Sequence, residues 1–347
     1  MIDEDIRVAK TLPSRFYTDK ECFQEQKKFF NRWQFAAHKS DIAANNILPL
    51  DTIESVTGEC MMLVDNDEVR SLSNVCTHRG MRLATEACQS KGLQCKYHGR
   101  RFNLDGTFLH MPEFEDAVNF PTEDDNLTEY PLAEWNGIYF TAVDVLKSLD
   151  LSFLDSRLSW LNISNFKRGS SRNREYTINA NWALYCENYL EGFHIPYVHP
   201  ELNQVLDYGD YRVECFSGGV LQIGIAKENE VCFDLPKTSP DYGLKVAAYY
   251  VWLFPNLMLN FYPWGLSVNI IVPISVNETK IIYQGYIKDS LLEYQGAGSE
   301  LDLVETQDQQ IVEMIQKGMS SRAYDRGRYS PTMEKGVHHF HRMLTED

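Results

Sequence analysis

The sequence predicts an α+β protein of two domains, one built from short β-strands and one that mixes strands with helices. Its 347 residues, of which 44% are hydrophobic, supply core material for two domains at roughly 100–200 residues each. The pattern changes near residue 39 from helical periodicity to short strands broken by turns. We therefore expect a helical segment over 1–38 that packs on the second domain, a β-rich domain over 39–145, and a mixed domain over 146–347.

The elements are predicted in chain order. Aromatic residues interleaved with charge predict an amphipathic helix over 18–38, with Thr18 and Asp19 as caps. A helix over 302–317 is expected to end at Gly318. Strands are predicted at 61–64, 102–104 and 138–143 in the first domain, and at 249–254, 268–272 and 281–286 in the second.

Composition excludes several classes of function. The chain has 33 Lys and Arg against 49 Asp and Glu, a net charge of −16, which argues against nucleic acid or anionic lipid as a partner. An acidic N-terminus without a signal-peptide pattern, and the lack of a ~20-residue apolar span, predict a cytoplasmic protein. Eight cysteines are too few for a disulfide scaffold of this length, so clustered cysteines indicate metal binding or catalysis.

The strongest motif is Cys76-Thr-His78, followed by Cys95-Lys-Tyr-His98. Each arm offers one thiolate and one imidazole in a turn-rich loop, a ligand set for Zn²⁺ or an iron–sulfur cluster. Zinc modules commonly pair like with like, whereas mixed arms suit a Rieske [2Fe–2S] cluster with both thiolates on one iron and both imidazoles on the other. We favour the cluster and keep structural zinc as the alternative.

A second constellation lies around His194 and His199. On an unbroken helix these two side chains would point ~140° apart, so we expect Pro196 to break the helix and let the imidazoles converge. Two His and one carboxylate form the facial triad of non-haem Fe(II) oxygenases. Spacing alone leaves four candidates for the third ligand: Asp302, Glu305, Asp308 and Glu313.

Together these motifs resemble those of the Rieske non-haem iron oxygenases, as the terminal-oxygenase α subunit, over nearly the whole chain. The resemblance implies a [2Fe–2S] cluster on Cys76, His78, Cys95 and His98, and an iron ion on His194, His199 and Asp308. It also implies a helix-grip (START-like) catalytic domain with an antiparallel sheet. Electrons would come from NAD(P)H through a separate flavin or iron–sulfur reductase, with or without a ferredoxin.

The resemblance further implies a homo-oligomer, usually a trimer, because the two metal sites of one chain lie too far apart in this family for fast electron transfer. Glu191 would then link His194 to His98 of the adjacent subunit, and Asn188 is counted with Glu191 among the catalytic residues.

The sequence departs from the family pattern at two positions. Ring-dihydroxylating members typically carry Asp in place of Glu191, and Arg100 stands where many relatives have an aromatic residue.

For the substrate we expect a small quaternary-ammonium or N-methylated compound, oxidised by monooxygenation. Tyr197, Glu191 and the segment 254–264 are similar to choline- and carnitine-type members, and aromatic faces can hold such a cation. The acidic net charge adds a weak attraction. Tyr189, Tyr197, Phe261 and Trp264 are the expected pocket residues, within a wider aromatic set that adds Tyr185, Phe193 and Tyr262.

Three alternatives stay open at this point. The chain could be the α subunit of an aromatic-ring dioxygenase, or a Rieske electron carrier without catalysis, although ~200 residues with their own His pair disfavour the carrier. The C-terminal cluster His338-His339-Phe340-His341 could bind metal, but a packed terminal helix is favoured.

Overall fold

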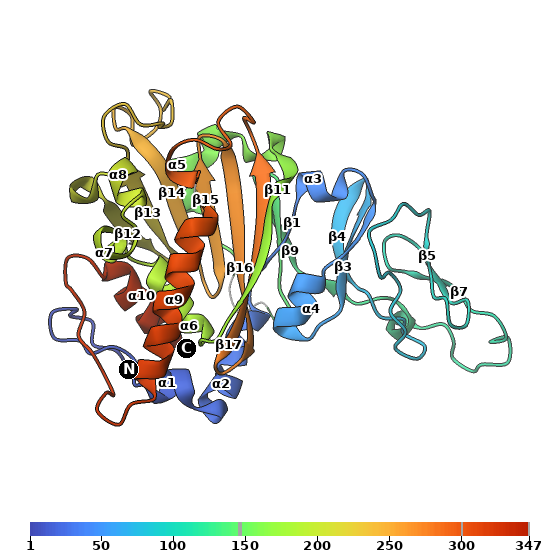
Figure 1. Cartoon of the computed structure of the whole chain (residues 1–347). Helices are drawn as coiled ribbons and strands as arrows, with labels where there is room; N and C mark the ends of the chain where they lie inside the picture. The colour runs from blue at the N-terminus through green and yellow to red at the C-terminus, as the bar shows by residue number, and fades with distance from the viewer. Residues whose placement is uncertain (145–147, 300, 346–347) are drawn as a thin grey trace. The chain divides into compact units, whose positions relative to one another are not determined.

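The computed structural model describes residues 1–144, 148–299 and 301–345, which form two compact units (Figure 1). The large unit contains residues 1–27, 150–161 and 166–347, and the small unit contains 28–149 and 162–165. The domain boundary predicted between 145 and 146 lies outside the described residues.

The described residues of the small unit form three antiparallel sheets. The first has the order β2-β3-β4-β8, the second β1-β10-β9 and the third β5-β6-β7. Their strands are β1 (Gln34–His38), β2 (Ile47–Pro49), β3 (Met61–Asn66), β4 (Glu68–Ser73), β5 (Leu93–Gln94), β6 (Arg101–Phe102), β7 (Phe108–His110), β8 (Glu129–Tyr130), β9 (Leu132–Trp135) and β10 (Ile138–Thr141). Two short helices, α3 (Lys39–Ile42) and α4 (Asp51–Thr57), lie on either side of β2 in the chain.

The N-terminal helix is shorter than predicted. Helices α1 (Arg15–Thr18) and α2 (Lys20–Gln26) are followed by a 3-10 turn over Lys27–Asn31, and β1 then pairs with β10. The prediction of a helix to residue 38 is therefore wrong for its last third. The N-cap at Asp19 is confirmed, because its side chain accepts the Glu21 and Cys22 amides. The bulky apolar residues near 35 fit the periodicity of a helix and that of a strand equally well. Pairing with a strand about a hundred residues later in the chain makes this segment a strand.

The large unit is organised by one seven-stranded antiparallel sheet of order β11-β17-β16-β15-β14-β13-β12. The strands are β11 (Lys167–Ile178), β12 (Arg212–Phe216), β13 (Gly219–Ile225), β14 (Val246–Leu253), β15 (Leu257–Tyr262), β16 (Gly265–Ser275) and β17 (Glu278–Ile287). The predicted strands of this half are confirmed, each longer than expected. The central strands β14, β15 and β16 are buried on both faces, which explains their near-continuous apolar sequences.

Helices cover one face of this sheet. Figure 1 shows α9 (Leu301–Met319) lying in front of the sheet, and it packs beside α6 (Trp182–Tyr189), which also contacts β16. The described part of this unit also contains α1, α2, α5 (Ser152–Leu158), α7 (Ile195–Val198), α8 (Leu202–Val205) and α10 (Lys335–Thr345). The α+β class and the antiparallel sheet with helices on it are as predicted.

The C-terminal histidines are accounted for by packing. His338 and His339 contact the backbone oxygens of Asp3 and Phe216. His341 forms a hydrogen bond with Tyr329 and lies 3.0 Å from Glu187 Oε1. The packed terminal helix is therefore confirmed. Within the described part of the chain, none of the helices combines the length and apolar character needed to cross a membrane.

Candidate functional site

Two short loops of the small unit bring two thiols and two imidazoles together. Cys76 and Cys95 are each 2% exposed, and the rings of His78 and His98 lie with their centroids 4.8 Å apart. Each loop makes the same turn, closed by a 3.0 Å hydrogen bond from a glycine amide to the cysteine carbonyl four residues earlier. Those glycines, Gly80 and Gly99, have φ of 70° and 77°, a left-handed conformation in which a side chain would be strained.

The residues of this site fit an iron–sulfur cluster. The His98 Nδ1 atom is buried and has no hydrogen-bond partner in the described part of the chain, as expected of a nitrogen that serves as a ligand. Burial raises the pKa of the Cys76 thiol, and a hydrogen bond with Cys95 raises it further. Burial also lowers the pKa of His78, helped by the neighbouring His98, so its imidazole is neutral and able to donate a lone pair.

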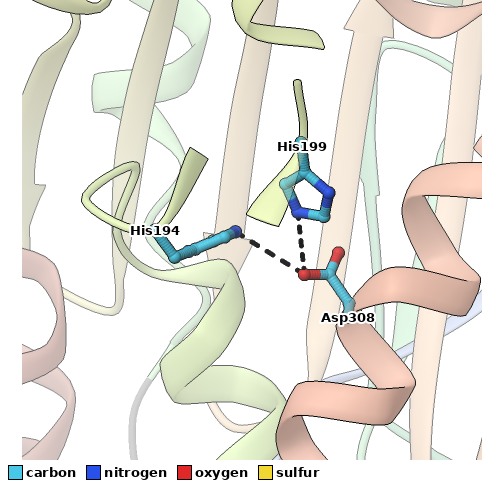
Figure 2. Close-up of side chains that lie close together, drawn as sticks. All are labelled: His194, His199 and Asp308. Atoms are coloured by element: carbon cyan, nitrogen blue, oxygen red, sulfur yellow. Dashed lines mark hydrogen bonds and ion pairs between the residues drawn. The ribbon is translucent and has the colours of Figure 1, made fainter. Parts of the chain in front are cut away.

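A second group of donors lies in the large unit, formed by His194, His199 and Asp308. One donor atom from each residue lies within 4.8 Å of the others. Figure 2 shows both imidazoles facing the same carboxylate oxygen, and the Nε2 atoms of His194 and His199 lie 3.5 and 3.0 Å from Asp308 Oδ1. Two imidazoles and one carboxylate converging on one point can hold a divalent iron and leave other positions open.

Neighbouring side chains fix the orientation of all three donors. Nδ1 of His194 lies 2.7 Å from Glu191 Oε1, and Nδ1 of His199 lies 2.7 Å from Gln307 Oε1. Asn188 donates a 2.7 Å hydrogen bond to Asp308 Oδ1. Metal-binding histidines commonly use their second ring nitrogen in this way. Burial opposes protonation of His199, but its contacts with Asp308 and Gln307 outweigh burial and raise its pKa.

The structure distinguishes Asp308 from the other carboxylates of α9. Asp302 pairs with Arg174 and Tyr176, and Glu313 accepts two hydrogen bonds from Asn179. Glu305 is 4% exposed and is bonded by other side chains. Among the four candidates, only Asp308 belongs to the group with both histidines.

The chain turns between the two histidines differently from the prediction. Helix α6 ends at Tyr189, five residues before His194, and Pro196 lies at the start of the short helix α7 instead of breaking a longer one. The two histidines flank α7 as its N-cap and C-cap residues. Proline suits the first turn of a helix because its missing N–H would have no partner there.

Beside these donors lies a cavity of about 110 Å³, between the sheet and helices α6 and α9. Six tyrosines contribute to its wall: Tyr185, Tyr189, Tyr211, Tyr250, Tyr262 and Tyr283. The acidic lining residues are Glu191, Glu305 and Asp308, and none of the described residues that line the cavity is Lys or Arg. The wall is therefore aromatic and carries negative charge.

Three of the four expected pocket residues lie elsewhere. Tyr189 lines the cavity, but Tyr197 is 80% exposed on α7 and does not. Phe261 is buried on the opposite side of β15 from Asn260 and Tyr262, because side chains alternate along a strand. Trp264 is buried in the turn after β15, stacked on Tyr262, with the Arg172 guanidinium 4.9 Å from its ring. Of the wider aromatic set, Tyr185 and Tyr262 line the cavity and Phe193 does not.

Glu305 lines the cavity, whereas its position in the sequence indicated only a candidate metal ligand. Tyr185 and Tyr283 donate their hydroxyls to its Oε2 atom, and Gln309 donates to Oε1 at 3.0 Å. Burial raises the pKa of this carboxyl, and the three hydrogen bonds oppose the shift. A bound cation would favour the ionised form of this carboxyl.

Tyr211, Tyr250 and Tyr283 were also missed as wall residues. Tyr250 and Tyr283 lie on β14 and β17, and strand alternation could have separated Tyr250 from its buried neighbour Tyr249. The register of the strands places Tyr250 and Tyr283 opposite α6 and α9, and that register cannot be read from the sequence.

Two family models match the chain. The Ring hydroxylating alpha subunit (catalytic domain) model matches residues 165–346, and the Rieske [2Fe-2S] domain model matches residues 32–131.

Among characterised proteins, the chain is 31% identical to the carnitine monooxygenase oxygenase subunit of Escherichia coli (strain K12), over 97% of this chain and 94% of the relative. It is 28% identical to the chloroplastic choline monooxygenase of Arabidopsis thaliana, over 97% of this chain and 82% of the relative.

Solved structures share the fold. The quaternary ammonium Rieske monooxygenase CntA in complex with its substrate L-carnitine aligns with a TM-score of 0.78 at 23% identity, covering 99% of this chain and 96% of that one. Naphthalene 1,2-dioxygenase from Rhodococcus sp. aligns with a TM-score of 0.74 at 17% identity, covering 96% of this chain and 92% of that one. The chain therefore belongs to the Rieske non-haem iron oxygenases, as an oxygenase α subunit whose cofactors are a [2Fe–2S] cluster and a mononuclear iron.

Proposed function

We propose that the protein is a terminal oxygenase that monooxygenates a small quaternary ammonium compound. The observation that carries this proposal is the position of His194, His199 and Asp308 at the edge of a tyrosine-lined cavity without a described Lys or Arg. The relatives named as carnitine and choline monooxygenases support the same substrate class.

Cys76, His78, Cys95 and His98 would hold the cluster, and His194, His199 and Asp308 would hold the iron. When bound, the cluster supplies single electrons and the iron activates O₂ for attack on the substrate. Glu191 and Gln307 would each keep the Nδ1 side of a ligand imidazole occupied, which leaves Nε2 as the ligand atom. Asn188 would hold the Asp308 carboxylate in place.

The cavity wall would recognise the substrate cation. A quaternary ammonium group has no hydrogen-bond donor, so tyrosine faces and a carboxylate are the partners that can hold it, at about 0.5–2 kcal/mol for each ring contact. Glu305 supplies a carboxyl group that is not part of the donor group of His194, His199 and Asp308. A substrate carboxylate would find no described Lys or Arg on this wall, which favours an amino alcohol such as choline over a betaine.

For the assembly we propose a homotrimer in the cytoplasm. Glu191 would connect His194 to His98 of the partner subunit and so provide the route between subunits. Electrons would come from NAD(P)H through a separate reductase, a flavin or iron–sulfur protein, with or without a ferredoxin. Analytical ultracentrifugation of the purified chain measures the assembly, and a monomer with full activity would contradict it.

The substrate proposal is tested by substrate-dependent O₂ consumption with a reductase and NAD(P)H. Choline should stimulate uptake more than glycine betaine or carnitine, and a hydroxylated or N-dealkylated product should form. Stimulation by neutral aromatic compounds alone would favour an aromatic-ring dioxygenase and overturn the substrate class. Equal stimulation by choline and the betaines would retain the class and remove the preference for an amino alcohol.

A further inference from the structure

Arg100 is a buried cation in the small unit, two residues after His98. Its side chain is 2% exposed, and its guanidinium carbon lies 4.8 Å from the ring centroid of Phe108, 5.5 Å from that of Phe120 and 5.6 Å from that of Phe102. Three aromatic rings therefore replace water around a permanent positive charge.

One carboxylate faces this cation. Arg100 Nη2 lies 2.7 Å from Asp125 Oδ1 and also donates to the Asp125 carbonyl at 3.1 Å. That carbonyl accepts a second hydrogen bond from the hydroxyl of Thr77, between Cys76 and His78. Arg100 thus joins the two ligand loops through Asp125, and its own carbonyl accepts the Cys95 amide at 2.8 Å.

The charge of Arg100 lies beside the ligands themselves. Arg100 is two residues from His98 on the same loop, and its carbonyl accepts the amide of Cys95. Its side chain is 2% exposed, so little water screens the guanidinium from the site. A Rieske cluster gains one negative charge on reduction, and the charge and hydrogen bonding around a cluster set its potential.

We propose that Arg100 raises the reduction potential of the Rieske cluster, with Asp125 offsetting part of its charge. The desolvated guanidinium stabilises the reduced form more than the oxidised form, because the extra electron adds negative charge within its field. This role is separate from the substrate proposal, since it concerns the readiness of the cluster to accept an electron from any donor.

Dithionite titration of the full-length holoprotein, followed by EPR, tests the proposal. Arg100→Met removes the charge and keeps the bulk, and its cluster should be reduced at a more negative potential. We expect about a tenfold change in the ratio of reduced to oxidised cluster at fixed potential, which is about 59 mV for a one-electron couple. Arg100→Lys keeps the charge and should stay closer to the wild type.

Two further variants separate charge from packing. Asp125→Asn removes the offsetting negative charge and should shift the potential upward, opposite to Arg100→Met. Arg101→Gln is the matched control, because this neighbouring cation is exposed and screened by solvent. If Arg100→Met fails to assemble a cluster, the potential of Asp125→Asn tests the proposal, and an upward shift supports it. An unchanged or lowered potential in Asp125→Asn, or an unchanged potential in loaded Arg100→Met, overturns the proposal.

Discussion

Glu191 and Asp308 lie on opposite sides of the His194 imidazole. Glu191 Oε1 is 2.7 Å from Nδ1, and Asp308 Oδ1 is 3.5 Å from Nε2. One imidazole therefore connects a carboxylate outside the donor group with the donor group itself. The proposed electron route between subunits requires this arrangement in the subunit that receives the electron.

Replacing Glu191 should slow electron transfer without loss of either metal. In Glu191→Ala and Glu191→Gln we expect the Rieske absorption and the iron content to persist, while substrate-dependent reoxidation of the reduced cluster by O₂ slows at least tenfold. Stopped-flow absorption measures this rate. Glu201→Ala, an exposed carboxylate near the same loop, is the control. Wild-type reoxidation rates in Glu191→Ala would remove Glu191 from the route.

Asp308→Ala should lose the mononuclear iron and keep the cluster. The wild type is expected to contain about three irons and two sulfides per chain, and the variant about two irons and two sulfides. Asp302→Ala removes an exposed carboxylate from the same helix and should keep all three irons. A wild type with about two irons would support an electron carrier, and iron retained in Asp308→Ala but lost in Glu305→Ala would reassign the ligand.

Glu305→Gln should weaken the binding of a cation specifically. We expect choline to bind about tenfold more weakly, or about 1.4 kcal/mol, because the variant keeps the size of the side chain and cannot carry a negative charge. The neutral isostere 3,3-dimethylbutan-1-ol should bind equally to both proteins. Asp302→Asn, which does not line the cavity, serves as the control for a lost charge. Equal weakening of both ligands would indicate a change of shape instead.

Glu313→Ala should destabilise the protein at neutral pH and less so in acid. The Asn179 amide and side chain donate to Glu313 at 2.8 and 3.0 Å and lower its pKa. A carboxyl with a depressed pKa in the folded state contributes stability above its unfolded pKa of about 4.3, and this contribution is lost as pH falls through the folded pKa. The expected cost at pH 7 is about 1 kcal/mol, limited by solvent screening.

Thermal unfolding of Glu313→Ala at pH 7 and at pH 4 measures this difference, with Gln310→Ala, exposed on the same helix, as the control. A difference in stability that is the same at both pH values would contradict an ionic contribution from Glu313.

The sequence was sufficient where chemistry restricts spacing. Cys76, His78, Cys95 and His98 are recognisable because a cluster needs four donors on two short loops, and the loops fold as local turns. His194 and His199 were recognisable for a similar reason. The turn between them was attributed to a helix broken at Pro196, whereas α6 already ends at Tyr189. The third donor could not be chosen from spacing, since four carboxylates share α9 and only the packing of that helix brings Asp308 to the histidines.

The cavity wall could not be predicted to the same extent. Phe261 and Tyr262 are adjacent and equally aromatic, yet one packs in the core and the other lines the cavity because they face opposite sides of β15. The strand at residues 34–38 was missed because its partner, β10, lies a hundred residues later. In both cases the deciding information is the pairing of distant strands.

The division of the chain has a consequence for biosynthesis. The small unit is complete once residue 165 has been translated, whereas the large unit needs both its first 27 residues and its last helix. Gln26 and Tyr17 bond Trp182 and Gln316, partners that emerge from the ribosome much later. The small unit can therefore fold during synthesis, while α1 and α2 can complete their packing only after α6 and α9 have been synthesised.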